Sequence, residues 1–132
     1  MKTLCLITAL LICAPAFAAK HAPLPDALLN AKTVYIVNQT GSQKVMDGAY
    51  SEITKWGRYS IAKDKESADT VMVFTRADQL VKGTSQDRVT LSVYLPNSQD
   101  PVYEDTSRRN FNSLAGIAKA CVNNFRKRVE EK

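Results

Sequence analysis

An amino-terminal export signal decides which part of this chain is left to fold, and in which chemical surroundings. One Lys precedes an apolar run from Leu4 to Ile12, and small residues follow that run. The run is too short to cross about 30 Å of hydrocarbon, and residues 16–18 have the A-x-A spacing of a cleavage site. We therefore expect a bacterial signal peptide over residues 1–18, and a mature protein that is periplasmic or secreted.

The mature chain has to fold without a disulfide. Removal of residues 1–18 leaves 114 of the 132 residues, which suffices for one domain with one core. Cys5 and Cys13 leave with the signal peptide, so Cys121 is then the only thiol. The fold must depend on apolar burial, even in an oxidising compartment. No second apolar run reaches membrane length, so we expect no membrane span after removal of the signal peptide.

The charge of the mature chain is moderately positive. The full sequence has 18 basic and 13 acidic residues, and the loss of Lys2 leaves a formal net charge of +4. Such a balance suits an anionic envelope polymer or lipid headgroups. It is too small to indicate nucleic-acid binding, and we expect none.

Two segments near the start of the mature chain differ in character. Residues 19–31 contain two prolines and no extended periodicity, so we expect a flexible arm that ends in a docked turn at Leu28 and Leu29. Residues 32–130 are expected to form a single domain. Within it, the β-branched run at 33–38 predicts a strand near the centre of a sheet.

Two helices and four further strands are expected in this domain. Apolar residues at helical spacing predict helices over 42–56, with Gly57 as the carboxyl-terminal cap, and over 110–129. Strand patterns occupy 58–62, 70–75, 89–95 and 102–106, and polar residues 77–87 are expected to form a loop. The strands at 58–62 and 70–75 are expected to pair as a hairpin. This order predicts an α+β fold in which two helices pack on one face of a four- or five-stranded, mostly antiparallel sheet.

The domain resembles small exported bacterial proteins of unassigned function. The resemblance rests on KTVYIVN at 32–38, KWGRYSI at 55–61, the Ala68-Asp69 pair, LSVYLP at 91–96 and FRKRVE at 125–130. Related proteins tend to have Trp where this chain has Tyr103, and an amphipathic aromatic remains. The architecture is also similar to the amino-terminal domain of TolB and to lipoprotein activators of peptidoglycan synthases. The resemblance implies the fold and the compartment only, because fold does not imply function.

The single histidine suggests one possible metal site. Cleavage after Ala18 would leave His21 as the third residue of a free Ala19-Lys20-His21 terminus. The terminal amine, two backbone amides and the imidazole supply four nitrogens in the square-planar arrangement that Cu(II) and Ni(II) favour. Metal binding by His21 is therefore an alternative function, although one His in a short basic tail needs no metal to explain it.

Catalytic residues and cofactor-binding motifs are not apparent in the sequence. Cys121 lies on the apolar stripe of the last predicted helix, and no serine has a G-x-S-x-G context. Isolated glycines and the absence of CxxC and HExxH patterns leave cofactor chemistry unsupported. We therefore expect no enzyme activity and no cofactor, and a small hydrolase is the least favoured function.

A binding role fits the remaining features. Arg58, Tyr103, Arg108 and Arg109 combine an amphipathic aromatic with basic groups, a composition that is common in interaction surfaces. We expect a non-enzymatic binding or adaptor domain of the bacterial envelope. Its partner would be another envelope protein or an anionic envelope polymer.

Overall fold

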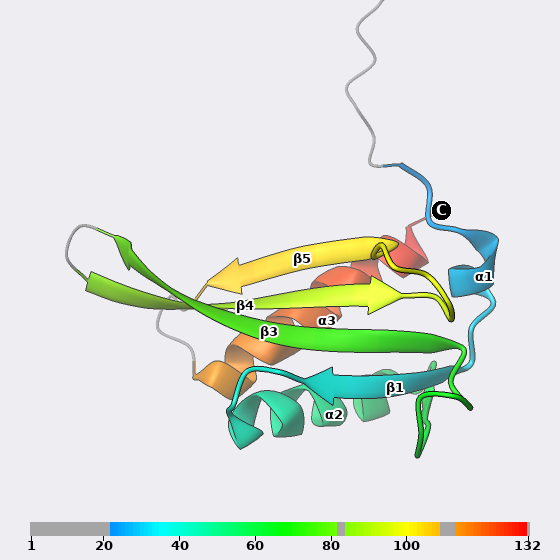
Figure 1. Cartoon of the computed structure of the whole chain (residues 1–132), viewed down its shortest axis with the longest axis horizontal. Coiled ribbons are helices and arrows are strands. Elements are labelled where there is room, and N and C mark those ends of the chain that lie inside the picture. The colour runs from blue at the N-terminus through cyan, green and yellow to red at the C-terminus, as the bar shows by residue number, and fades with distance from the viewer. Residues whose placement is uncertain (1–21, 82–83, 109–112, 132) are drawn as a thin grey trace, which may run out of the picture.

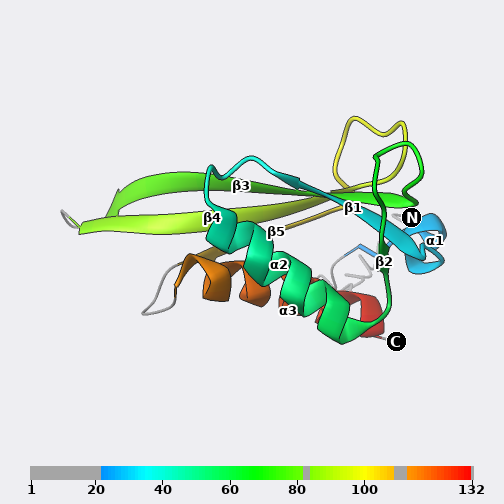
Figure 2. The ribbon, with the colours of Figure 1, turned by 90° about the horizontal axis from the view of Figure 1, so that it is seen from below.

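The computed structural model describes residues 22–81, 84–108 and 113–131, which form three helices and one open five-stranded sheet (Figure 1). The elements are α1 (Asp26–Leu29), β1 (Thr33–Asn38), α2 (Gln43–Trp56), β2 (Ser60–Ile61), β3 (Thr70–Val81), β4 (Thr84–Tyr94), β5 (Tyr103–Arg108) and α3 (Leu114–Glu130). Both long helices, α2 and α3, cover the same face of the sheet (Figure 2). The predicted α+β class and the placement of the two helices on one face are confirmed.

The sheet is mixed, with the strand order β2-β1-β3-β4-β5. The strand β1 is parallel to both β2 and β3, whereas β4 is antiparallel to β3 and to β5. Strands therefore flank β1 on both sides, which agrees with its predicted central position. The long antiparallel strands β3 and β4 make up the middle and the projecting end of the sheet (Figure 1).

The predicted hairpin between residues 58–62 and 70–75 is wrong. The strand β2 instead pairs with β1 in parallel. The backbone N–H of Ser60 donates to the Lys32 carbonyl, and that of Ala62 donates to the Val34 carbonyl, both at 2.8 Å. The helix α2 connects β1 to β2, and a helical crossover brings the chain back to run parallel to its first strand. The turn at 63–69 then carries the chain over to β3, on the other side of β1.

The predicted loop at residues 77–87 is also wrong, because β3 and β4 continue through this segment as a hairpin. Their ladder extends from Val71↔Tyr94 to Val81↔Thr84. Before the turn, Arg76 forms an ion pair of 2.6 Å with Asp87 across the two strands. Backbone pairing and this cross-strand pair compensate for the low β-propensity of the polar residues here.

The two long helices match their predicted periodicity. The helix α2 ends at Gly57, whose φ of 72° is left-handed and whose N–H donates to the Ile53 carbonyl at 3.2 Å. The helix α3 begins after Ser113, whose hydroxyl accepts from the Gly116 N–H at 3.2 Å; the predicted start at 110–112 lies outside the described residues. Their buried side chains meet the inner face of the sheet in one core: Val45, Ala49, Ile53, Ile117, Ala118, Cys121, Val122 and Phe125 from the helices, and Val34, Ile36, Met72, Phe74, Val89, Leu91 and Val93 from the strands.

An aromatic cluster closes the core at the carboxyl-terminal ends of the helices. The ring of Phe125 lies 5.9 Å from Trp56, 6.4 Å from Tyr59 and 4.9 Å from Tyr103, measured between ring centroids. The indole N–H of Trp56 donates to Glu130 at 2.9 Å, which ties α2 to α3. Burial raises the pKa values of Tyr59 and Tyr103 above the usual tyrosine range, so both rings stay neutral.

Two arginines hold the segment before β1 against the domain. The guanidinium of Arg58 donates to the Leu29 carbonyl, and that of Arg128 donates to the Ala22 carbonyl. The short helix α1 buries Leu28 completely in the core. The expected docked turn at this position is therefore present.

The side chain of Asp69 fixes the entry of β1 into the sheet. Its carboxylate accepts hydrogen bonds from the backbone N–H groups of Lys32 and Thr33, at 2.9 and 3.0 Å. The Thr33 hydroxyl in turn accepts from the Asp69 N–H at 2.8 Å. These backbone donors lower the pKa of Asp69, because they favour the charged carboxylate. Asp69 thus sets the register between β1 and β3.

Helices α2 and α3 are in close contact at Gly48. A methyl group at Gly48 would lie 2.4 Å from the carbonyl oxygen of Ala115 and 2.9 Å from its Cα. Both contacts are with backbone atoms, which cannot rotate away as a side chain can. The absence of a side chain at Gly48 is therefore a packing requirement, although glycine lowers helix propensity by about 1 kcal/mol relative to alanine.

We predict that Asp69→Asn lowers the melting temperature at pH 7 and has much less effect near pH 2. The pKa of Asp69 is lowered in the folded state, so its stabilisation is present above the unfolded value of about 3.9 and is lost as pH falls through the folded value. Thermal unfolding of both proteins across this range measures the difference. An equal loss of stability at both pH values would contradict this role of the charge.

We predict that Gly48→Ala lowers the free energy of unfolding by about 1–3 kcal/mol, the usual cost of overpacking. Chemical denaturation measures this change, and Ser51→Ala, at an exposed position of the same helix, is the matched control. The control should be neutral or slightly stabilising. A Gly48→Ala protein as stable as the control would show that the helices separate at little cost.

Candidate binding site on the open face of the sheet

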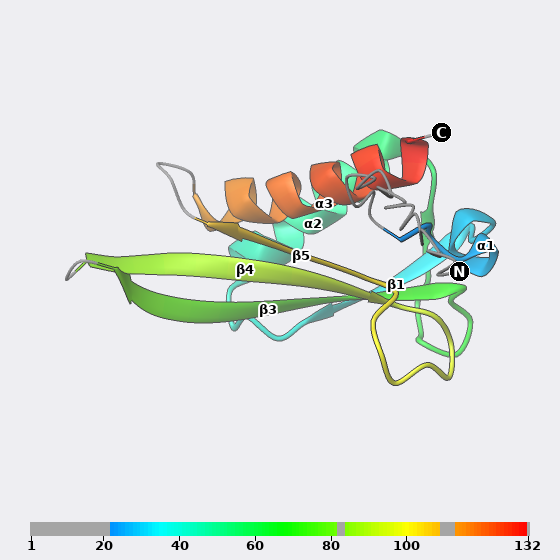
Figure 3. The same cartoon turned by 90° about the horizontal axis from the view of Figure 1, so that it is seen from above.

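The face of the sheet opposite the helices has no helix over it within the described chain (Figure 3). Strand pairing places Val37, Val73, Ser92 and Glu104 side by side across this open face. The Ser92 hydroxyl donates to the Glu104 carboxylate at 3.0 Å. The open face therefore changes from apolar over β1 and β3 to hydrogen-bonding over β4 and β5.

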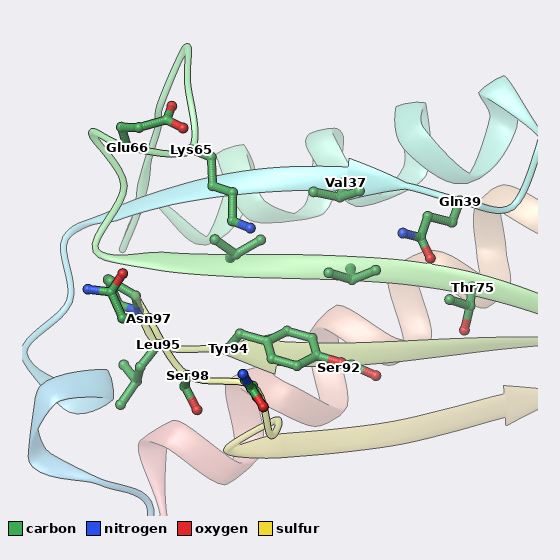
Figure 4. A pocket seen from close by; sticks show the side chains of 14 residues that line it. Val37, Gln39, Lys65, Glu66, Thr75, Ser92, Tyr94, Leu95, Asn97 and Ser98 are labelled. Carbon is green, nitrogen blue, oxygen red and sulfur yellow. The ribbon is translucent and has the colours of Figure 1, made fainter.

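Two loops rise on this open face and turn part of it into a concavity. The segment 95–100 and the turn 63–69 both lie on the side away from α2 and α3 (Figure 3). Between them and the strands is a volume of about 940 Å³, open on one side. Its lining residues are Val37, Gln39, Lys65, Glu66, Val71, Val73, Thr75, Ser92, Tyr94, Leu95, Pro96, Asn97, Ser98 and Gln99 (Figure 4). We call this site the open-face concavity.

Local hydrogen bonds shape both loops. In the first, Asn97 has a left-handed φ of 62°, and the Ser98 N–H and hydroxyl donate to the carbonyl groups of Leu95 and Asp100. In the turn, the Ser67 N–H donates to Asp64 at 2.8 Å, and hydrogen bonds from Ser67 lower the pKa of that carboxylate. Hydrogen bonds within each loop therefore stabilise the conformation of both loops that border the concavity.

The opposite end of the concavity is held by the continuation of β1. The Gln39 N–H donates to the Phe74 carbonyl at 2.8 Å, which keeps Gln39 beside β3. The Asn38 side chain then accepts from the Thr40 N–H and hydroxyl and donates to the Ser42 carbonyl. This turn leads the chain away to α2 and leaves Gln39 at the concavity (Figure 4).

The lining can bind a ligand by packing and hydrogen bonding. Valines and the Tyr94 ring supply apolar surface, and the amides of Gln39, Asn97 and Gln99 supply donors and acceptors. The charged lining residues are Lys65 and Glu66, which are of opposite sign. Within the described residues, no group of three His, Cys, Asp or Glu side chains is placed to hold a metal ion.

Three residues of the predicted partner surface, Arg58, Tyr103 and Arg108, lie within the described chain. Arg58 contacts the Leu29 carbonyl and lies 5.7 Å from the centroid of the Tyr59 ring. Tyr103 packs against Phe125 at the start of β5, and Arg108 ends that strand, roughly 17 Å away at 3.4 Å per residue. Tyr59 and Tyr103 both pack against Phe125, so Arg58 and Tyr103 border the same aromatic cluster, and a partner surface there stays a prediction.

Two other predicted positions are outside the described residues. Arg109 follows the end of β5, and His21, with Ala19 and Lys20, precedes the first described residue. The partner surface and the Cu(II) site both stay predictions at these positions.

Sequence reasoning missed most of the open-face concavity. In the sequence, Thr90, Ser92 and Tyr94 alternate with apolar residues in 89–95, which places them on the face opposite the core. This alternation was the one indication of the site in the sequence. The contribution of Lys65 and of the 95–100 segment depends on which side of the sheet each loop takes. The periodicity of the strands does not predict on which side of the sheet a loop lies.

Comparisons with known proteins support the fold. The sequence matches no protein-family model and no curated protein. Among solved structures, the PelC dodecamer from Paraburkholderia phytofirmans has a TM-score of 0.53 at 16% identity, over 84% of this chain and 95% of that chain. A PelC variant from the same organism has a TM-score of 0.51 at 14% identity, over 76% and 89% of the two chains.

A minor lipoprotein from Acinetobacter baumannii has a TM-score of 0.48 at 12% identity, over 74% of this chain and 91% of that chain. The similarity to the two PelC structures, at 16% and 14% identity, supports the fold alone. The comparisons do not show the expected similarity to TolB. Among the residues that the structure describes, no helix combines the length and hydropathy that crossing a bilayer requires.

We predict that Cys121 does not react with thiol reagents in the folded protein. Its side chain is completely buried, its thiol donates to the Val89 carbonyl at 3.4 Å, and burial raises its pKa. Labelling by a maleimide should be slow in buffer and complete in denaturant. Rapid stoichiometric labelling under native conditions would contradict this burial and reopen a reactive role for the thiol.

Proposed function

We propose that this protein is a non-enzymatic binding domain of the bacterial envelope and that the open-face concavity holds its ligand. The observation that carries the proposal is the position of the two loops. Both rise on the face of the sheet without helices and enclose hydrogen-bonding side chains around an apolar floor. A site of this composition favours orientation and retention of a ligand.

The lining supports binding better than catalysis. It includes no imidazole and no thiol, and its Ser92 hydroxyl donates to the carboxylate of Glu104. A serine nucleophile is ordinarily activated by an adjacent imidazole or amine base, and the lining has no imidazole. The polar groups are mainly neutral amides and hydroxyls, which suit recognition.

An envelope location is supported by the predicted signal peptide over residues 1–18. The fold is similar to that of PelC, which forms a dodecamer, and this similarity raises the question of self-association. We infer that the mature chain works outside the cytoplasm, and that contacts between copies have to be distinguished from ligand binding in any test.

We predict that a photoreactive diazirine amino acid at Gln99 captures a ligand in living cells. Gln99 lines the concavity, and Tyr50, 51% exposed on the outer side of α2, is the matched control position. A diazirine inserts into the C–H and O–H bonds of proteins and polysaccharides alike. We expect a discrete adduct from position 99, weakened by Tyr94→Leu, and none from position 50.

The alternatives are distinguishable in the same experiment. An adduct with the mass of two copies would assign this face to self-association and contradict the proposal. No adduct at position 99, or equal adducts at both positions, would contradict it as well.

A further inference from the structure

We propose that the open-face concavity takes a segment of an uncharged polysaccharide. This inference rests on the proposed binding function and names the chemical class of the ligand. It is carried by the charge of the lining, by the hydrogen-bonding groups and by the aromatic floor.

The charge of the lining argues against an anionic ligand at this site. The whole chain has a net charge of +5, but the charged side chains at the concavity are Lys65 and Glu66, which cancel formally. They are adjacent in sequence and lie together at one edge (Figure 4). An anionic polymer would gain little electrostatic attraction here, and a neutral ligand does not depend on such attraction.

The hydrogen-bonding groups match the hydroxyl groups of a sugar. Each of the amides of Gln39, Asn97 and Gln99 both donates and accepts, as does the hydroxyl of Thr75. The Ser98 hydroxyl donates to the Asp100 carbonyl and can accept. A sugar hydroxyl also donates and accepts, so it can pair with either end of such a group. The groups are distributed around the site and come from Gln39 directly after β1, from β3 and from the 95–100 loop.

The floor of the site favours a sugar chain over an extended peptide. The central strands β3 and β4 are each paired on both sides, so a peptide cannot add here as a further strand. Affinity must come from side chains, and the Tyr94 ring lies over the floor beside Ser92 (Figure 4). The C–H face of a pyranose packs on such a ring while its hydroxyls point outward to the amides.

The dimensions fit a segment of a chain. A volume of about 940 Å³ is near the upper end of the roughly 300–1,000 Å³ of small-molecule sites. The site is open on one side, so a polymer can enter and leave it without its ends being enclosed. Several consecutive sugar units are therefore the expected occupant.

The test is a titration of the isotope-labelled, exported chain, followed by NMR. The probes are the hexamers of glucose, in α-1,4 and β-1,4 linkage, and of N-acetylglucosamine, with polygalacturonate as the anionic comparison. We expect at least one neutral hexamer to shift the amide signals of Val73, Ser92 and Asn97 in a saturable manner. Polygalacturonate should not shift these signals.

Variants identify the side chains responsible. Tyr94→Leu keeps apolar volume but removes the ring, and we expect it to weaken binding at least tenfold, or about 1.4 kcal/mol. Tyr50→Leu changes an exposed residue of α2, which covers the other face of the sheet (Figure 2), and this variant should bind as the native chain does. An unchanged spectrum for the Tyr94→Leu protein in the absence of sugar confirms that it is folded.

The proposal is overturned if no neutral hexamer shifts these signals up to about 10 mM, or if only polygalacturonate does. Equal binding by the Tyr94→Leu protein would overturn it too. The photo-crosslinking experiment separates the two levels of inference. A protein adduct at position 99 without sugar binding would retain the binding function and reject the polysaccharide.

Discussion

The apolar stripes of α2 and α3 have to be buried, and both are buried against the same face of one sheet. The two helices contact each other at Gly48, and together they lie against β1, β4 and β5. The aromatic cluster around Phe125 closes the same layer at its carboxyl-terminal end. With both helices on one side, the other face of the sheet remains available, and the loops that rise on it form the candidate site.

The connections of the sheet place the walls of that site. Because β2 is parallel to β1 at the edge, the chain has to cross to the far side of β1 before β3 can begin. The crossing is the turn 63–69, which supplies Lys65 and Glu66, and Asp69 then joins it to the start of β1. One turn therefore supplies both Asp69, which holds the start of β1, and the two residues at one edge of the concavity.

Much of the fold, and little of the site, could be predicted from the sequence. Helical spacing predicted both long helices, and the alternation from Val89 to Leu95 predicted the strand that β4 contains. The partner of β2 was missed because the two residues Ser60–Ile61 contain too little pattern to specify a neighbour. The concavity depends on loops, and their direction follows from the whole sheet topology, which local periodicity does not specify.

Protection of the open face in the cell would test the account most directly. In a Gln99→Cys protein the introduced thiol lies at the concavity, while Cys121 is buried, so a maleimide reports on position 99. Labelling rates would be compared between intact cells with a permeable outer membrane and the purified mature chain, with Thr54→Cys on α2 as the control. A bound ligand predicts slower labelling in cells at position 99 alone. Equal rates in cells and in solution at both positions would contradict the claim that the open-face concavity is a binding site.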